Sequence, residues 1–568
     1  MDLPRLTHVP LDSASRRNSH PHRPSTHSHL VLALGLSAFA AGSPLRSDPC
    51  TAISNATWLK PSQANSCLSY FPFNATLRDN IVDVLSKTFH QFHASTKFHL
   101  NMPEPYEDIT VDILGELQRI KRSTYSLDFE LHQDVSKTAK RLADGHANYV
   151  NYCYDSLFLT YLPFPLAVLA EPGHEDIQNI YIIPEASEIT RKEFEGGALK
   201  IWHSALGWNL SDYDGARIVS IGGQDPWHVV EAYAATAGIY QAKSIRQNGF
   251  FSSYQLLNYE MGGFARPEWS THGDSVSLTL VRNGTTTEET YDVPYLSRKE
   301  GGARNFTNAK ELWANNCRPT KTTNGPPLDR IAQKKEKVAA GAELTSPEDP
   351  FSRPARFQRD PIIPQLYRGR PLAVSSLVSD GPQFGIALPE NLIPTGNVSS
   401  NSDMNWFVLE DGKTAVLRLF SFSGDLADLY QNVLDGIDTV KSKGASRLLI
   451  EATNNGGGYV CLASWLRRVL AGPVTGLDLL PGMNTSVRAQ ELPKKIVDVI
   501  VNNKTGLSAE EISGSLYNPT TWKDVNKETL LADNNWLNPS HEVQVNELLI
   551  YSHIRRRQLS VPIGSPGN

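Results

Sequence analysis

One strand-to-helix junction limits the possible folds of this chain more than any other stretch. In residues 446–472, SRLLIEATNNGGGYVCLASWLRRVLAG, an apolar run from Leu448 to Ala452 predicts a buried strand. The apolar spacing from Tyr459 to Leu470 then predicts a helix. Two asparagines and three consecutive glycines separate them. So much bare backbone between a strand and a helix indicates a loop that lies against something else.

The same stretch belongs to a strand–helix–strand–helix succession. TAVLRLFSF, from Thr414, predicts a strand, and residues 425–442 predict an amphipathic helix. Strand, crossover helix and strand in this order imply a parallel pair with a right-handed connection. The glycine loop is therefore expected at the carboxyl end of a parallel strand, where open α/β sheets bind their ligands.

Three interpretations of the loop are open from the residues alone. A nucleotide phosphate would suit a helix N-terminus, but the stretch has neither G-x-G-x-x-G nor a following Gly-Lys-Ser/Thr. The oxyanion of an acyl-transfer intermediate would be stabilised by roughly 3–4 kcal/mol for each pre-organised backbone N–H. The third interpretation is a tight turn without a ligand, which glycine favours through its backbone freedom.

A second unusual stretch is RLADGHANYVNYCY, residues 141–154. The pattern predicts a helix that ends at Asp144 and Gly145, with Gly145 as the left-handed terminator. An alternating strand is expected to begin at once with His146. A histidine at such a junction is held rigidly and can still be exposed, which suits a general base. A purely structural histidine is the alternative.

Together, LADGHANYVNYCY and the downstream LLIEATNNGGGY resemble the fungal secreted branch of the tail-specific (C-terminal-processing) serine peptidases, which is similar to chlamydial protease-like activity factor. The opening DPCTAISNATWLKPSQANSCLSYFPFN and the segment GARIVSIGGQDPW share the resemblance, which covers roughly residues 48–545. It implies an α/β (crotonase-like) core with parallel strands, a helical N-terminal cap and a β-rich PDZ-like module. His146 would be the general base, and Gly456, Gly457 and Gly458 would help to form the oxyanion hole.

The departure from that family concerns the nucleophile and its acidic partner. Family members carry the reactive serine on a later strand-to-turn element, whereas Ser508, Ser513, Ser515 and Ser540 lie in polar or loop-like stretches here. We therefore expect the C-terminal part of the catalytic domain to be missing, as in a truncated or frame-shifted gene model. A secreted serine endopeptidase that is incomplete or inactive as given is the first hypothesis. A non-catalytic secreted glycoprotein that binds extended peptides is the second.

These patterns divide the chain into six segments. They are a leader and signal peptide (1–42), the helical cap ending at the Asp-Gly-His segment (43–150), a β-rich region (151–319) that includes the PDZ-like module (about 205–295), a charged Pro-rich linker or insertion (320–370), the truncated tail-specific peptidase core (371–545) and an aberrant basic tail (546–568).

The leader is expected to direct secretion. Leu30–Ala41 is a short apolar run ending in small residues, which is typical of a signal peptide and too short to span a bilayer. A mitochondrial transit peptide is the alternative, because serine and arginine are frequent there. Secretion is favoured by sequons along the chain, which make these asparagines glycosylation candidates: Asn55, Asn74, Asn209, Asn283, Asn305, Asn397, Asn484 and Asn503.

The cysteines also favour secretion. Cys50 and Cys67 lie close together after the leader, as a local disulfide would. Cys153, Cys317 and Cys461 leave an odd number, so a partner is expected in the missing segment. Five unrelated buried thiols are the alternative interpretation.

Composition and charge exclude some classes of binding partner. The formal net charge of -6 and the lack of a basic stripe exclude a generic nucleic-acid surface. Beyond the signal, no apolar run is long enough for a membrane span, so no membrane partner is expected after cleavage. His90 and His93 have metal-ligand spacing on a helix, but no third ligand is nearby, so a packed or solvated pair is expected. The expected partner is a peptide or protein substrate, without metal or cofactor; the oligomeric state is left open.

Overall fold

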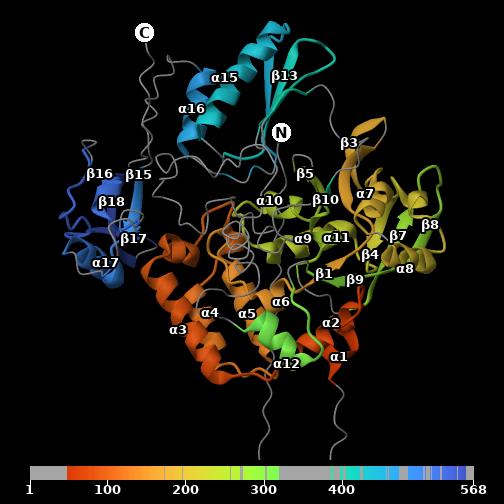
Figure 1. Ribbon diagram of the computed structural model, residues 1–568, viewed down its shortest axis with the longest axis horizontal. Coiled ribbons are helices and arrows are strands. Elements are labelled where there is room, and N and C mark those ends of the chain that lie inside the picture. The colour runs from red at the N-terminus through yellow and green to blue at the C-terminus, as the bar shows by residue number, and fades with distance from the viewer. Residues whose placement is uncertain are drawn as a thin grey trace, which may run out of the picture. The chain divides into compact units, whose positions relative to one another are not determined.

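The computed structural model describes residues 48–318, 386–387 and 397–557, with short interruptions in the first and last ranges (Figure 1). All of these residues belong to one compact unit, Asp48–Asn568. The expected leader (1–42) and insertion (320–370) lie outside the described residues. Helices combine with largely antiparallel sheets, so the chain has α/β character. No helix in the described part is long and apolar enough to cross a membrane.

The region between the leader and residue 144 is mainly helical, as its apolar spacing predicts. Val82, Leu117 and Leu131 belong to one buried cluster that joins three helices. Side-chain caps begin two of them, since Asn74 accepts the N–H of Leu77. The elements are α1 (Pro49–Ile53), α2 (Pro61–Leu68), α3 (Ala75–Gln91), η1 (Ala94–Leu100), η2 (Glu107–Ile109), α4 (Ile113–Arg122), which is capped by Asp112, α5 (Asp128–Lys140) and α6 (Tyr152–Asp155).

The end of α5 differs from the prediction. The helix ends at Lys140, and the residue in the left-handed region is Ala143 (φ 48°), not Gly145. No strand begins at His146 in the described stretch 141–157. The physical reason is local: the Asp144 carboxylate accepts the backbone N–H of His146 at 2.8 Å, and the Asn151 side chain accepts two N–H groups that start α6. Such side-chain bonds replace the backbone pairing that a strand needs.

A five-stranded antiparallel sheet, in the order β2-β3-β4-β7-β8, forms the centre of the following region. Gly222, Gly223 and Gly284 all have positive φ, which suits the turns after β4 and between β7 and β8. Asp225 caps the helix that follows β4. The elements are β2 (Leu166–Glu171), β3 (His174–Ile182), α7 (Ala186–Glu193), α8 (Gly197–Leu206), η3 (Leu210–Tyr213), β4 (Arg217–Ile221), α9 (Pro226–Ala237), α10 (Lys243–Asn248), α11 (Gly262–Ala265), β7 (Ser275–Val281) and β8 (Glu288–Pro294).

Two smaller sheets accompany it. One pairs β1 (Phe158–Tyr161) with β9 (Leu296–Lys299). The other has the order β10-β6-β5, with β5 (Ser253–Gln255), β6 (Asn258–Glu260) and β10 (Ile386–Ala387). The described residues before 319 end with α12 (Ala309–Leu312) and η4 (Trp313–Cys317).

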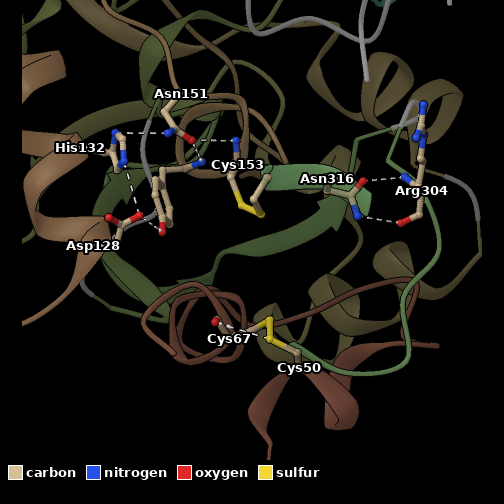
Figure 2. Close-up of a disulfide and its surroundings, with 10 residues drawn as sticks. Cys50, Cys67, Asp128, His132, Asn151, Cys153, Arg304 and Asn316 are labelled. Atoms are coloured by element: carbon tan, nitrogen blue, oxygen red, sulfur yellow. Dashed lines mark hydrogen bonds and ion pairs between the residues drawn. A yellow bond between two sulfur atoms is a disulfide. The ribbon is translucent and has the colours of Figure 1, made fainter. Parts of the chain in front are cut away.

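Two disulfides tie this part of the chain together (Figure 2). Cys50–Cys67 confirms the predicted local bridge. Cys153 pairs with Cys317, 164 residues away, a bridge that the sequence did not predict. The alternative interpretation, in which all five cysteines are unrelated buried thiols, is excluded. The sequence spacing gave no sign of the second pairing because it is not local.

The glycine loop lies in a separate four-stranded sheet with the order β11-β12-β13-β14. β13 and β14 are parallel and α15 connects them, as predicted. β14 is not buried, however, because it is the edge strand and most of its residues are exposed. The elements are β11 (Asn397–Ser400), β12 (Met404–Val408), β13 (Thr414–Leu419), α15 (Leu426–Ser442), β14 (Arg447–Glu451) and α16 (Val460–Ala471).

The C-terminal residues form a further sheet, β15-β18-β16, with β17 also paired to β18. Residues 548–557, in the segment expected as an aberrant basic tail, form the central strand β18 of this sheet. The elements are β15 (Asn484–Arg488), α17 (Glu491–Val501), η7 (Pro519–Thr521), β16 (Trp522–Lys523), β17 (His541–Val545) and β18 (Leu548–Arg557).

Candidate functional site

The glycine loop is held to the end of β13 by one asparagine. The Asn455 side-chain amide donates to the carbonyl of Leu419 at 2.8 Å, and its oxygen accepts the N–H of Gly457 at 2.8 Å. The Gly457 carbonyl in turn accepts the N–H of Phe422 at 2.7 Å. The loop is therefore bonded to the chain that leaves the neighbouring strand.

Gly457 occupies a position that favours glycine. Its φ is 84°, in the left-handed region, and no described atom lies within 4 Å of where a Cβ would stand. Because its N–H is bonded to Asn455, an oxyanion donor from this loop would come from Gly456 or Gly458, which lie outside the described residues.

The strand that leads into the loop is open on both faces. Leu448, Leu449 and Ile450 are 38%, 49% and 45% exposed, and consecutive residues of a strand point to opposite faces. In the described part of the chain β14 pairs only with β13, and no described strand pairs with its other edge. At the carboxyl end, Glu451 lies 3.6 Å from Arg418 of β13.

His146 lies on the surface. Its side chain is 93% exposed, and its Nδ1 lies 3.7 Å from Oδ1 of Asp144. The same oxygen accepts the backbone N–H of His146, closing a turn of the Asx type. The imidazole is thus open to solvent and adjacent to a carboxylate, which is the setting of a general base.

The other oxygen of Asp144 is engaged by His93. His93 Nε2 lies 3.0 Å from Asp144 Oδ2, and the His93 ring is largely buried, with 12% of its side chain exposed. This hydrogen bond, assisted by the His146 backbone N–H, lowers the pKa of Asp144, although partial burial opposes the shift. Asp144 therefore stays ionised to low pH.

His93 is fixed in its turn by groups from two other elements. Its Nδ1 lies 3.3 Å from the Ser95 hydroxyl, and its ring packs edge-to-face on Phe89. Arg488 of β15 is buried and donates to the His93 carbonyl at 3.0 Å. The burial of His90, together with the charge of Arg488, lowers the pKa of that neighbouring histidine. In the described part of the chain no group of three or more His, Cys, Asp or Glu residues could hold a metal ion.

Two of the serines considered above are described. The Ser515 hydroxyl accepts the N–H of Tyr517 at 3.2 Å. The Ser540 hydroxyl accepts a hydrogen bond from the Lys494 ammonium at 3.0 Å. Neither contact joins a serine to His146. Ser508 and Ser513 lie outside the described residues.

The contacts thus form two groups, one around His146 and one around Gly457. The first contains Asp144 and His93, which sequence reasoning did not assign to a site. Asp144 had a sequence signal, because an aspartate two residues before a histidine can close an Asx turn. His93 was noticed for its spacing to His90, but its contact with Asp144 spans 51 residues and has no local signal.

The predicted glycosylation sites lie mainly on the surface. Six of the eight asparagines have a described side chain, and all six are exposed: Asn55, Asn74, Asn209, Asn283, Asn305 and Asn397. Asn503 lies outside the described residues. This exposure and the two disulfides are compatible with a secreted protein.

Comparison with known proteins gives a distant relation. No protein-family model matches the chain. Two curated proteins of Diaporthe leptostromiformis, the peptidase S41 family proteins phomP1' and phomP1, are each 23% identical over 419 residues, which is 71% of this chain and 52% of the relative. The chain spans about half the length of the curated relatives it matches. The chain is thus distantly similar to peptidases of the S41 family.

Proposed function

We propose that this chain belongs to a secreted serine endopeptidase of the tail-specific type, similar to the chlamydial enzyme, and that His146 is its general base. The observation that carries the proposal is the exposed imidazole of His146 beside the ionised Asp144, in a chain similar to S41 peptidases. A peptide or unfolded protein is the substrate class.

In this mechanism a serine hydroxyl attacks the peptide carbonyl and its proton passes to the His146 imidazole. The imidazolium then gives the proton to the leaving amine, and water releases the acyl group by the reverse sequence. Backbone N–H groups of the glycine loop stabilise the oxyanion. The serine remains to be assigned, because the described contacts of Ser515 and Ser540 lead to other partners.

The modular proposal follows from the same resemblance. The strand β4, its double-glycine turn, α9 and the β7–β8 hairpin support a PDZ-like module at about 205–295. The parallel β13–β14 pair with its crossover helix supports a crotonase-like core.

A second function is favoured by the open edge of β14. A strand with a free edge and three exposed apolar side chains suits the addition of an extended peptide as a further strand. The chain would then bind peptides without cleaving them.

A fluorophosphonate probe, which labels activated serines, tests the first proposal on the secreted full chain. Labelling of one serine in the wild type, lost in His146→Ala and kept in His174→Ala, would support it. His174 is a matched control because it is an exposed histidine on β3, outside the site. Labelling that is unchanged in His146→Ala would refute the role of His146.

The second function has its own test, binding of a reduced, unfolded protein such as carboxymethylated casein without cleavage or labelling. Leu449→Lys should weaken that binding, whereas Leu434→Lys, at an exposed leucine of α15, should not. Equal affinities in both variants would exclude β14 as the binding edge.

A further inference from the structure

Asp144 is bonded to two histidines that come from different parts of the chain. Its Oδ2 contacts Nε2 of His93 at 3.0 Å, and its Oδ1 both accepts the His146 N–H and lies 3.7 Å from the His146 ring. The three residues run from a largely buried histidine, through a half-buried carboxylate, to an exposed histidine. Asp144 thus lies between a histidine of the interior and a histidine of the surface.

The proton on His93 has a defined place. An ionised carboxylate only accepts hydrogen bonds, so His93 Nε2 must carry the hydrogen that points to Asp144. The hydroxyls of Ser95 and Thr96, at 3.3 and 3.4 Å, face the other ring nitrogen. His93 therefore holds one oxygen of Asp144 in a fixed orientation and leaves the second oxygen for His146.

That second oxygen faces one nitrogen of the exposed ring. The 3.7 Å between Asp144 Oδ1 and His146 Nδ1 is longer than a hydrogen bond, but a small rotation of the exposed imidazole closes it. The bond requires a hydrogen on Nδ1, which leaves the lone pair of a neutral imidazole on Nε2. Nε2 is the ring nitrogen that does not face Asp144, and the ring is exposed to solvent.

We propose that Asp144 is the positioning residue of His146 and that His93 holds Asp144 for this task. The Asp144 carboxylate selects the His146 tautomer with hydrogen on Nδ1, so that Nε2 can accept the nucleophile's proton. This inference rests on the proposed function for its catalytic meaning. The selection of the tautomer is independent of catalysis and can be measured by itself.

The test is nitrogen NMR of the secreted chain labelled with ¹⁵N-histidine, at a pH where His146 is neutral. The His146 signals are identified by their loss in His146→Gln. The wild type should show hydrogen on Nδ1 of His146, and Asp144→Asn should remove that preference. The same tautomer of His146 in both proteins would overturn the proposal.

Substitutions at His93 test the second link. His93→Gln keeps an N–H donor near the position of Nε2 and should preserve the Nδ1–H tautomer of His146, whereas His93→Phe should lose it. Equal behaviour of these two variants would overturn the role of His93. If His93→Phe does not fold, His93→Leu, which is smaller and also lacks a donor, takes its place in the comparison with His93→Gln.

Activity separates this inference from the proposed function. If the chain hydrolyses peptides, Asp144→Asn should lower kcat by up to the roughly 10²–10⁴-fold that a positioned base contributes, with KM little changed. A fall in kcat without a change of tautomer would overturn the positioning role. An absence of hydrolysis in every protein would refute the proposed function alone, since the NMR result still tests the tautomer.

Discussion

The glycine loop yields the sharpest prediction, because the chain contains a matched control for it. Gly457 and Gly412 both have positive φ, 84° and 62°, and no described atom lies within 4 Å of either Cβ position. Gly412 lies in the β12–β13 connection of the same sheet. Alanine at either site therefore meets the same kind of backbone strain and no clash.

The expected loss of stability on substitution by alanine is the difference between two opposing contributions. A left-handed alanine costs about 1–2 kcal/mol, and reduced freedom of the unfolded chain returns about 0.4–1 kcal/mol. The net loss of local stability is about 1 kcal/mol in both variants, which corresponds to roughly fivefold faster hydrogen exchange in β13 and β14. Exchange measured by mass spectrometry should show similar changes in Gly457→Ala and Gly412→Ala.

The two variants should differ in function. If the loop serves the oxyanion, Gly457→Ala should shift the neighbouring donor groups of the loop and lower kcat by about tenfold or more, up to the roughly 10²–10³-fold that one lost donor costs, with KM little changed. Gly412→Ala should retain the wild-type kcat. Equal loss of activity in both variants would refute the functional role and support a plain tight turn.

Three further predictions concern stability and processing. Gly436→Ala in α15 should destabilise the sheet by about 1–3 kcal/mol, because the new Cβ would lie 2.2 Å from the Trp406 ring. This loss should outweigh the higher helix propensity of alanine. An unfolding midpoint at or above the wild-type value would contradict the prediction. Since the pKa of Asp144 is lowered from 3.8, its contribution to stability is present above about pH 4 and is lost as pH falls further. His93→Phe removes the hydrogen bond that is the largest cause of this shift, so it should lower the free energy of unfolding more at pH 7 than at pH 2. An equal loss at both pH values would be evidence against this role of His93. Peptide mapping without reduction should find the disulfides Cys50–Cys67 and Cys153–Cys317. A glycosidase that removes N-linked glycans should lower the mass of the secreted chain. Other cysteine pairings, or an unchanged mass, would contradict these assignments.

The local elements of the fold could be predicted from the sequence. The strand at Thr414, the helix α15, the strand at Leu448 and the helix α16 each begin within one residue of the predicted position, because hydrophobic periodicity is a local signal. The exposure of β14 could not be predicted. An apolar run reads the same in a central strand and at an edge, and only the sheet order distinguishes them.

The contacts that build the candidate site are mostly non-local. The Asp144–His93 bond and the Cys153–Cys317 bridge join residues 51 and 164 positions apart, and neither spacing follows a known motif. Near His146, the prediction placed the left-handed residue at Gly145, whereas it is Ala143, one residue before the turn that the Asp144 side chain closes. The candidate base could be chosen from the sequence, but the residues that orient it could not.

If His146 is the base of a peptidase, hydrolysis should depend on its side chain, and one rate comparison tests this dependence. Hydrolysis of an unfolded protein substrate is measured at equal concentrations of the secreted wild type and His146→Ala. Because the His146 side chain is 93% exposed, its removal should leave folding intact. The wild type should cleave the substrate, and the rate of cleavage should be about 10²–10⁴-fold lower in the variant. Cleavage at the wild-type rate by His146→Ala, or no cleavage by the wild type, would contradict this prediction.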